Sequence, residues 1–381
     1  MHDPIYLQDE HRMLRDQLRR FIDEEVLPHG EMWERDGMVP RDIVRKMGEL
    51  GFLGIRYPEA HGGAELDTIA TMVLSEELGR STFGGFAITV LVHTDMASPH
   101  LANAGTEAQK AKYLPRIISG ELVTAVGVTE PDAGSDVAGI RTRATKTNGG
   151  WILNGSKMFI TNGVYGDLYF VAAKSGEGGG RSREVTMFIL EKGTEGFSVA
   201  RPLEKMGWRS SDTAELVFDN CFVPNEHVLG DVHRGFYAIM QNFQNERLVL
   251  GAQSMGEAQK ALEITLDYVK NRKAFDGTLW DKQAIRQRLS QRLAEVEAGR
   301  HLIYHAAWLD TQGIDCVKEV SMVKAYCGEL VNKVMYDCQQ FHGGFGYMQE
   351  SVIERMVRDA RVQSVGGGAS EVMLEEVAKR V

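Results

Sequence analysis

The spacing of apolar residues changes twice along the chain, and these changes constrain the fold more than any other feature. Apolar side chains recur at helical spacing through the first third and again after residue 235. The predicted helices cover residues 8–28, a segment with Pro40 in its first turn, 67–78, a segment from 86, and 107–118 behind a Thr106–Gln109 capping box. The later ones are predicted near 235–270, 283–311, 316–340, 351–362 and after 369.

The middle of the chain, from about residue 123 to 228, follows a different pattern. Short runs rich in β-forming residues are separated by glycine, and Asn148-Gly149 and Asn154-Gly155 are signals for hairpin turns. The stretch 175–183, SGEGGGRSR, has no apolar anchor and is predicted to be an exposed, mobile loop. We therefore predict an α+β protein: an N-terminal helical part, a small antiparallel barrel or sandwich, and a C-terminal antiparallel helical bundle.

Charge and composition narrow the class of protein further. The 381 residues are 43% apolar and 25% charged, as is typical of soluble globular proteins, and they carry a net charge of −10. Since no basic stripe stands out, we expect no nucleic-acid partner. No run of about eighteen apolar residues exists, so we expect no membrane span. The first twenty residues are charged throughout and resemble neither a secretion signal nor a transit peptide, so we expect a cytoplasmic protein.

Several familiar kinds of chemistry have no support in the sequence. Four cysteines fit a reducing compartment, and Cys316, Cys327 and Cys338 would share one helix face about 16 Å apart, as buried core residues. His301 and His305 are spaced for a metal, but no third ligand is near, so no metal site is predicted. No glycine fingerprint for a dinucleotide, no P-loop and no nucleophile elbow is present.

One carboxylate falls on the apolar face of a predicted helix. In the helix from 235, Glu246 continues an apolar stripe made of Phe236, Ile239, Met240, Phe243 and Leu250. A carboxylate there is partly desolvated, which raises its pKa toward the range of a general base. The alternative is a carboxylate at the helix edge that pairs with Arg247 or another arginine.

Five motifs in order along the chain resemble one family. They are TEPDAGSD (129–136), ITNG (160–163), RKAF (272–275), QQFHGGFGY (339–347) and RDARVQSVGGGASE (358–371). With the order helices, sheet, helices, they resemble the acyl-CoA dehydrogenases over nearly the full length. DTAEL (212–216) and GFYAIMQNFQNERL (235–248) are most similar to the long-chain and isovaleryl-type members.

The resemblance implies an architecture and a reaction. It implies an N-terminal α-helical domain (1–122), a middle antiparallel β-barrel (123–232) and a C-terminal four-helix bundle (233–381), with subunits assembled as a homotetramer. FAD would bind between barrel and bundle, completed by a neighbouring subunit. The protein would remove a proton from Cα and a hydride from Cβ of an acyl-CoA, giving the trans-2-enoyl thioester. Electrons would pass to an electron-transferring flavoprotein, as in fatty acid β-oxidation.

The resemblance also assigns residues. Those implied to contact FAD are Val126, Val128, Thr129, Ser135, Phe159, Ile160, Thr161, Arg272 from the neighbouring subunit, Phe275, Gln283, Gln340, Gly343, Gly344, Gly368 and Ala369. Those implied to contact the acyl-CoA are Ser135, Tyr237, Gln244, Arg247, Gly366 and Gly367. The thioester oxygen would accept hydrogen bonds from a backbone N–H and from the flavin ribityl chain, an oxyanion-hole arrangement.

The sequence departs from the family pattern at the expected base. Most members carry that glutamate in a Tyr-Glu-Gly-Thr motif, where this chain has Gly366-Gly367-Gly368-Ala369. Either the protein is a non-catalytic relative or the base has moved. Long-chain and isovaleryl members carry the base on the first helix of the bundle, and the matching residue is Glu246. Ala369 lacks the usual hydroxyl, and Asp276 replaces a common glycine.

Two alternative functions and one expectation about the substrate remain. The chain could be a flavin oxidase or monooxygenase of the same superfamily, or a CoA- or flavin-binding protein without catalysis. The acyl pocket of relatives is lined by the helix that corresponds to 86–99. Gly84, Gly85 and Ala87 at its deep end are small, which suggests a medium or long, or a branched, acyl tail.

Overall fold

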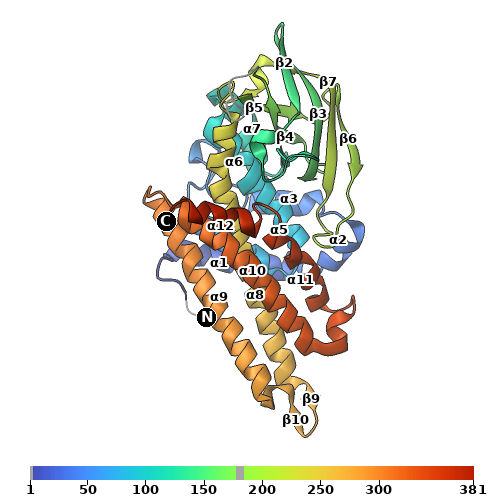
Figure 1. The fold of residues 1–381 in the computed structure, drawn as a ribbon, viewed down its shortest axis with the longest axis vertical. Helices are drawn as coiled ribbons and strands as arrows, with labels where there is room; N and C mark the ends of the chain where they lie inside the picture. Colours follow the sequence, from blue (N-terminus) through green and yellow to red (C-terminus); the bar gives the residue numbers. More distant parts are fainter. Residues whose placement is uncertain (1–2, 177–183) are drawn as a thin grey trace.

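The computed structural model describes residues 3–176 and 184–381 in one elongated arrangement. The sheet lies at one end, the long C-terminal helices extend to the other, and the N-terminal helices pack between and beside them (Figure 1). Of the loop predicted at 175–183, residues 177–183 lie outside the described part of the chain. None of the described helices is long and apolar enough to cross a membrane.

The N-terminal part is helical, as predicted. Its longer elements are α1 (Asp9–Phe21), the π-helix η1 (Ile22–Val26), α2 (Gly30–Asp36), α3 (Arg41–Glu49), α4 (Thr68–Arg80), α5 (Gly84–Leu91), the π-helix η3 (Val92–Ala97), α6 (Ser98–Ala104) and α7 (Glu107–Ile118). The capping box of α7 is confirmed, because the Gln109 amide donates to Thr106 Oγ1 and Gln109 Oε1 accepts from the Thr106 amide.

Two details of this helical prediction were wrong. The helix expected over 8–28 changes to π geometry at Ile22. Pro40 does not stand in the first turn of α3 but precedes it, with an extended backbone at φ −62° and ψ 144°. In both cases the helix exists and only its local geometry differs, since spacing of apolar residues defines a face and not a hydrogen-bond pattern.

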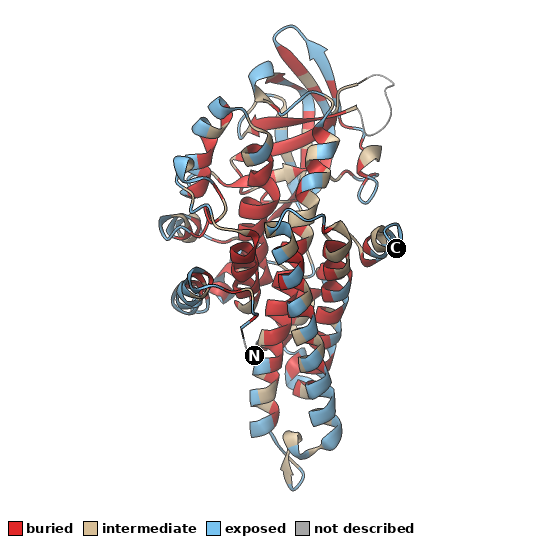
Figure 2. Cartoon of the chain, turned by 90° about the vertical axis from the view of Figure 1, so that its left-hand side faces the viewer, coloured by how far each residue is buried: buried red, intermediate tan, exposed pale blue. Residues whose placement is uncertain are grey.

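The buried residues gather in the middle of the molecule, where α4, α5 and η3 are surrounded by other elements (Figure 2). Every residue of α5 and η3 is buried. A helix buried all round cannot show an apolar stripe. These segments therefore form a central layer on which the sheet and the long helices both pack, and η3 is the part that reaches the candidate site.

The sheet has eight strands in the order β6-β7-β3-β2-β4-β5-β8, with β1 beside β4. The strands are β1 (Thr124–Gly127), β2 (Arg143–Thr147), β3 (Gly150–Thr161), β4 (Leu168–Lys174), β5 (Val185–Glu191), β6 (Phe197–Pro202), β7 (Thr213–Pro224) and β8 (Val228–Leu229). Most neighbours are antiparallel, as predicted, but β1 and β2 both pair with β4 in parallel. The sheet has its own apolar core, which includes Trp151, Tyr169 and Phe188.

The two turn signals had different outcomes. Asn148-Gly149 does connect β2 and β3 as a hairpin, with Gly149 at φ +78°. Asn154-Gly155 was wrongly predicted as a turn: it lies inside β3, where the register against β7 shifts between Leu153 and Gly155. Glycine favours a bulge as well as a turn, and the local sequence does not separate the two.

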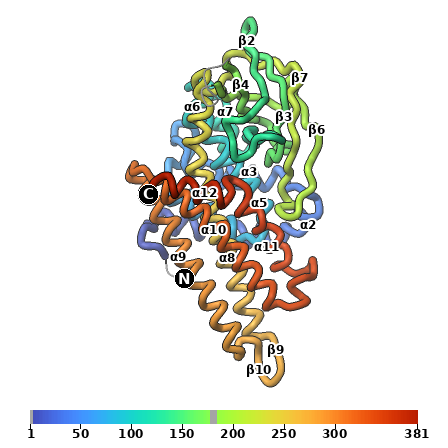
Figure 3. Tube along the Cα trace, in the orientation of Figure 1, coloured from blue at the N-terminus to red at the C-terminus, as the bar shows by residue number. Residues whose placement is uncertain are grey.

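The C-terminal part consists of long helices close to the predicted ranges. They are α8 (Gly235–Asn271), α9 (Gln283–Thr311), α10 (Val317–His342), α11 (Val352–Ala360) and α12 (Ser370–Ala378), with a small hairpin of β9 (Lys273–Ala274) and β10 (Gly277–Thr278) after α8. Cys316, Cys327 and Cys338 are free and buried, as expected. After α11 the chain turns back, and α12 packs across α10 (Figure 3).

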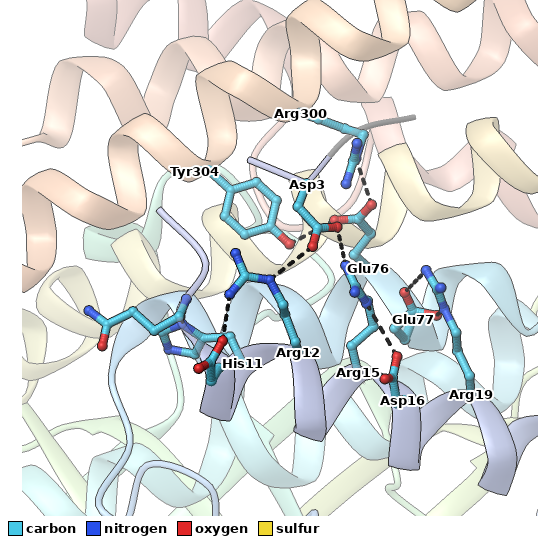
Figure 4. A network of polar contacts seen from close by, with 12 residues as sticks. Asp3, His11, Arg12, Arg15, Asp16, Arg19, Glu76, Glu77, Arg300 and Tyr304 are labelled. Atoms are coloured by element: carbon cyan, nitrogen blue, oxygen red, sulfur yellow. Dashed lines mark hydrogen bonds and ion pairs between the residues drawn. The ribbon is translucent and has the colours of Figure 1, made fainter. Parts of the chain in front are cut away.

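Ion pairs fasten the first helix to the rest of the molecule. Arg19 on α1 forms a two-pronged contact with Glu77 on α4, at 2.9 and 2.8 Å. The neighbouring Glu76 accepts hydrogen bonds from Arg300 Nε at 2.6 Å and the Tyr304 hydroxyl at 2.8 Å, both on α9 (Figure 4). A buried carboxylate with two strong donors is well compensated. The contacts join the N-terminal helices to the bundle through α4.

The predicted domain boundaries fall between secondary-structure elements. The boundary at 122/123 lies between α7 and β1, and the one at 232/233 lies between β8 and α8. The division into three domains at these boundaries stays a prediction.

Candidate active site

Glu246 lies in the fourth turn of α8 with 8% of its surface exposed, on the side that packs against η3. Asn242, one turn earlier, donates from Nδ2 to Glu246 Oε1 at 3.0 Å. Burial raises the pKa of Glu246 to about 8, while the Asn242 hydrogen bond and the positive charge of Arg247 act in the opposite direction. The face predicted from the apolar stripe is confirmed. Among the described residues, no arginine forms a salt bridge with Glu246.

The glycine-rich tail segment lies against α8 one turn after this carboxylate. A methyl group on Gly367 would lie 2.2 Å from Leu250 Cδ1, and one on Gly368 would lie 3.7 Å from Arg247 Nε. Gly367 and Gly368 have φ of +63° and +103°, values that side chains other than glycine rarely adopt. A glutamate at 367 would therefore need a strained backbone and a displaced Leu250. The segment offers main-chain groups here, and Glu246 supplies the carboxylate.

Lys324 on α10 holds that segment in place, a role the sequence reasoning missed. Its Nζ donates to the carbonyl of Gln363 at 2.6 Å and to that of Gly368 at 3.0 Å. Burial and the nearby charge of Arg247 lower the pKa of Lys324 to about 8. A lysine on an otherwise apolar helix face, between Val320 and Cys327, was the available signal.

The two remaining substrate candidates on α8 lie in its first and third turns. Tyr237 is exposed, and the Arg234 guanidinium lies over its ring at 4.4 Å from the centroid. Gln244 is half-buried. They are seven residues apart and so share one helix face, on roughly the opposite side of α8 from Glu246.

The two sequence segments implied to contact a flavin ring lie side by side at the end of the sheet. The amide of Met158 donates to the Thr129 carbonyl at 2.9 Å. The fully buried Lys157 donates from Nζ to the Val128 carbonyl at 3.1 Å and to Glu130 Oε1 at 2.7 Å. Glu130 also accepts from the Thr142 amide at 3.0 Å. This buried ion pair, which sequence reasoning missed, fixes the loop 128–136 to β3.

Phe159 is the feature of this region that best fits an aromatic ligand. It is 64% exposed, has φ +61°, and lies where the register of β3 against β7 shifts between Lys157 and Ile160. A bulky residue in a left-handed conformation costs free energy and is often found at ligand sites. Ile160 points into the core of the sheet, so only its main chain could reach a ligand there, whereas Thr161 is half-buried and Ser135 is exposed. These residues fit a planar flavin.

Six of the other residues implied to contact FAD lie at the far end of the molecule, whereas Val126 is in β1 and Gly368 and Ala369 directly precede α12. Arg272 follows α8 directly, 26 residues after Glu246, which is about 39 Å along the helix. Tyr268 stacks on His342 at 4.3 Å between centroids and so joins this end of α8 to the end of α10. Six candidates are all exposed here: Arg272, Phe275, Gln283, Gln340, Gly343 and Gly344. One subunit therefore does not bring its two groups of candidates together.

The expectation about the acyl pocket was wrong in one respect. Gly84 and Gly85 do not leave open space, because a methyl group on Gly84 would lie 2.5 Å from Trp208 Cδ1 and one on Gly85 would lie 2.3 Å from Ser210 Oγ. The Gly84 amide also donates to Asp359 Oδ2 at 3.0 Å. The small residues allow the loop after β6 to approach α5, and they do not indicate the length of the acyl chain.

The buried carboxylate, the main-chain loop beside it and the exposed Phe159 at the sheet are features expected of a flavin-dependent dehydrogenase. Three family descriptions match in order: "Acyl-CoA dehydrogenase, N-terminal domain" (residues 8–121), "middle domain" (125–221) and "C-terminal domain" (233–381). The chain belongs to the acyl-CoA dehydrogenase family, whose members are flavoprotein oxidoreductases of fatty acid oxidation.

Individual relatives match nearly the whole chain. The mitochondrial long-chain specific acyl-CoA dehydrogenase of Mus musculus is 38% identical over 374 residues, 98% of this chain and 86% of the relative. The isovaleryl-CoA dehydrogenase of Solanum tuberosum is 36% identical over 370 residues, 97% and 89% of the two chains. An acyl-CoA dehydrogenase structure from Geobacillus kaustophilus has a TM-score of 0.95 at 38% identity, with 99% of each chain covered. The FAD complex of PigA has a TM-score of 0.95 at 26% identity, covering 100% and 99%.

Proposed function

We propose that this protein is an FAD-dependent acyl-CoA dehydrogenase in which Glu246 removes the Cα proton of the substrate. The observation that carries the proposal is the placement of Glu246: a nearly buried carboxylate, with a pKa raised to about 8, next to the Gly366–Gly368 main chain. A base whose pKa lies near the working pH transfers protons efficiently. When bound, FAD would accept the hydride that leaves Cβ of the acyl group.

The chain supplies three further elements of this reaction. A main-chain N–H of the glycine segment would donate to the thioester oxygen and stabilise negative charge that develops there. Lys324 keeps that segment in its left-handed conformation through the carbonyls of Gln363 and Gly368. Arg247, next to the base, places a positive charge beside the thioester and favours the ionised carboxylate before proton transfer.

The substrate proposed is an acyl-CoA with a medium or long, or a branched, acyl chain. Relatives named for long-chain and for isovaleryl substrates support this class. The glycines of α5 give it no support, since Trp208 and Ser210 occupy the space beside them. We propose an electron-transferring flavoprotein as the acceptor.

The test is anaerobic reduction of the purified flavoprotein by saturated acyl-CoA thioesters from C4 to C16, together with isovaleryl- and citronellyl-CoA. Bleaching of the flavin by one or more of them is expected in the wild-type protein. Glu246→Gln should keep its flavin and bind the same thioester, but it should reduce very slowly. Normal reduction in this variant, or no bleaching with any thioester, would contradict the proposal. Stoichiometric peroxide formation in air would indicate an oxidase instead.

We also propose that the flavin site is shared between subunits of a homotetramer. Arg272 is exposed, lies about 39 Å from Glu246 along α8, and forms no salt bridge among the described residues. Its guanidinium suits a pyrophosphate, which must then belong to the site of another subunit.

Mixing two inactive variants tests this sharing. Arg272→Ala should lose FAD, and Glu246→Gln should keep FAD but lose activity. Exchange of subunits between the two folded variants, without unfolding, should restore activity. A mixed pair of subunits contains one site in which both residues are intact. If mixed oligomers form but are no more active than the sum of the two separate variants, each subunit completes its own site.

A further inference from the structure

Asn242 connects the proposed base to the backbone carbonyls at the end of the π-helix η3. Pro99 has no N–H, so it cannot donate to the carbonyl of Asp95 four residues earlier, where the π-helix η3 passes into α6. Asn242 Nδ2 lies 3.3 Å from that carbonyl and 3.0 Å from the carbonyl of Met96. Asn245 Nδ2 donates to the Asp95 carbonyl as well, at 2.9 Å.

The same amide group reaches the carboxylate. Asn242 Nδ2 has two hydrogens, and its two shortest contacts are the Met96 carbonyl and Glu246 Oε1, both at 3.0 Å. Asn242 is buried, so its side chain is held by its contacts with η3 and does not exchange them for water. An N–H that is held in place by a second acceptor presents its other hydrogen in one direction only, and here that direction is Glu246.

We propose that Asn242 is a positioning residue, which uses the Met96 carbonyl as an anchor to orient the Glu246 carboxylate and to stabilise its ionised form. The inference rests on the proposed function of Glu246. It assigns to Asn242 a role that Asn245 does not share, although both are asparagines on α8 that bind the same stretch of backbone.

The other charged groups around Glu246 do not replace this contact. Arg247 follows it on α8 and favours the ionised carboxylate only through its charge. On the η3 side, Asp95 lies 3.8 Å from Arg56, which balances its charge. From α10 and α12, Lys324 and Glu376 act on Arg247. The amide of Asn242 is the hydrogen-bond donor recorded on Glu246 within the described residues.

The expected effect follows from removing a hydrogen bond to a charged group. Such a loss raises the pKa of the carboxylate by about one unit or somewhat more, which lowers the ionised fraction about tenfold at a pH below the pKa. In Asn242→Leu, the rate of flavin reduction should therefore fall about tenfold near pH 7 and approach the wild-type rate near pH 10. Asn242→Ser, whose hydroxyl is too short to bridge the two acceptors, is a second variant with the same expected direction.

The experiment measures anaerobic flavin reduction from pH 6 to 10 in the holoenzyme, with Asn245→Ala as the matched control. A shift of the pH profile in both Asn242 variants and an unshifted profile in the control support the proposal. An unshifted profile in the Asn242 variants overturns it, and so does a rate that falls equally at every pH, which a merely structural role would give.

A second readout does not depend on turnover. The carboxyl C=O stretch of Glu246, isolated as the infrared difference between wild type and Glu246→Gln, can be titrated without substrate. Its midpoint should rise in Asn242→Leu and stay unchanged in Asn245→Ala. If Glu246→Gln reduces normally, the proposed function fails. If Glu246→Gln is inactive but the midpoint does not move in Asn242→Leu, only the inference about Asn242 fails.

Discussion

Glu246 and Glu257 lie about three turns apart on α8 and have nearly the same local surroundings. Each accepts a hydrogen bond from an amide side chain one turn earlier, Asn242 at 3.0 Å and Gln253 at 2.8 Å. Burial raises the pKa of both carboxyl groups to about 8. A raised pKa by itself therefore does not identify the base.

Their further neighbours separate the two residues. Arg247 favours the ionised form of Glu246, whereas the carboxyl group of Asp359 opposes ionisation of Glu257. Glu257 is 3% exposed and packs in the interior, where the adjacent Gly256 meets the main chain of Glu76. Glu246 lies instead beside the glycine segment 366–368. In addition to desolvation, a catalytic carboxylate needs a route to its ligand and a nearby positive charge.

The largest effect should come from replacing each carboxylate by its amide. We expect Glu246→Gln to slow flavin reduction by about 10² to 10⁴-fold, the usual contribution of a general base. Glu257→Gln should stay within a few-fold of wild type, because Glu257 touches no reacting group. Stopped-flow reduction with the best thioester measures both. A large loss in Glu257→Gln with its flavin content intact would remove the distinction drawn between the two residues.

The next effect concerns the dependence of stability on pH. The pKa of Glu257 is about 8 in the folded protein and 4.5 in its ordinary state, so the folded form binds the proton more tightly. The resulting stabilisation is complete below pH 4.5, falls as the pH rises, and is lost above about pH 8. The slope in that window is at most about 1.4 kcal/mol per pH unit for one group.

Glu257→Gln removes this contribution and serves as its measurement. The difference in unfolding free energy between variant and wild type should shift in favour of the variant as pH rises from 5.5 to 8.5. Asp359, whose pKa is raised to about 7, interacts with Glu257, so the difference also includes the change that the substitution makes in the titration of Asp359. Urea unfolding, or the unfolding temperature where refolding is incomplete, records the trend. A difference that does not vary with pH would mean that Glu257 is not a buried, protonated acid.

The smallest effect tests why position 367 carries no carboxylate. Gly367 and Gly313 have similar backbone angles, φ +63° and +66°, but only Gly367 has a neighbour, Leu250, in the space of a side chain. An alanine in this conformation costs about 1 to 2 kcal/mol at either site. Gly367→Ala should cost more than Gly313→Ala, and it should also weaken binding of the thioester. Equal losses of unfolding temperature would show that Leu250 moves aside freely.

Local sequence predicted much of the candidate site because helical spacing is a local property. The stripe from Phe236 to Leu250 placed Glu246 on a buried face before any tertiary contact was known, and α8, α9 and α10 begin and end close to the predicted positions. The glycines at 366–368 indicated that the usual base was missing. What failed depended on partners far away in the chain: the parallel pairing of β1 with β4, and the contact of Gly84 with Trp208.

The residues that fix the site were also beyond local reasoning. The sequence alone shows Lys157 only as a charged residue of a predicted strand. In the structure it is fully buried against Glu130, 27 residues earlier in the chain. Lys324 meets carbonyl groups near the C-terminus, and Asn242 meets the carbonyl of Met96 at the end of η3. Each of these pairs becomes visible only when two distant segments are brought together.

The sequence by itself therefore determined the helices, the presence of a sheet, the family resemblance and the place of Glu246 on an apolar face, since all of these are carried by spacing and by short motifs. Tertiary structure decided which of two buried carboxylates on α8 lies beside the glycine segment, because burial and charge depend on what packs against a residue and not on its neighbours in the chain. It also showed that α8 runs unbroken from Glu246 to Asn271, just before Arg272, so that the proposed site needs a second subunit.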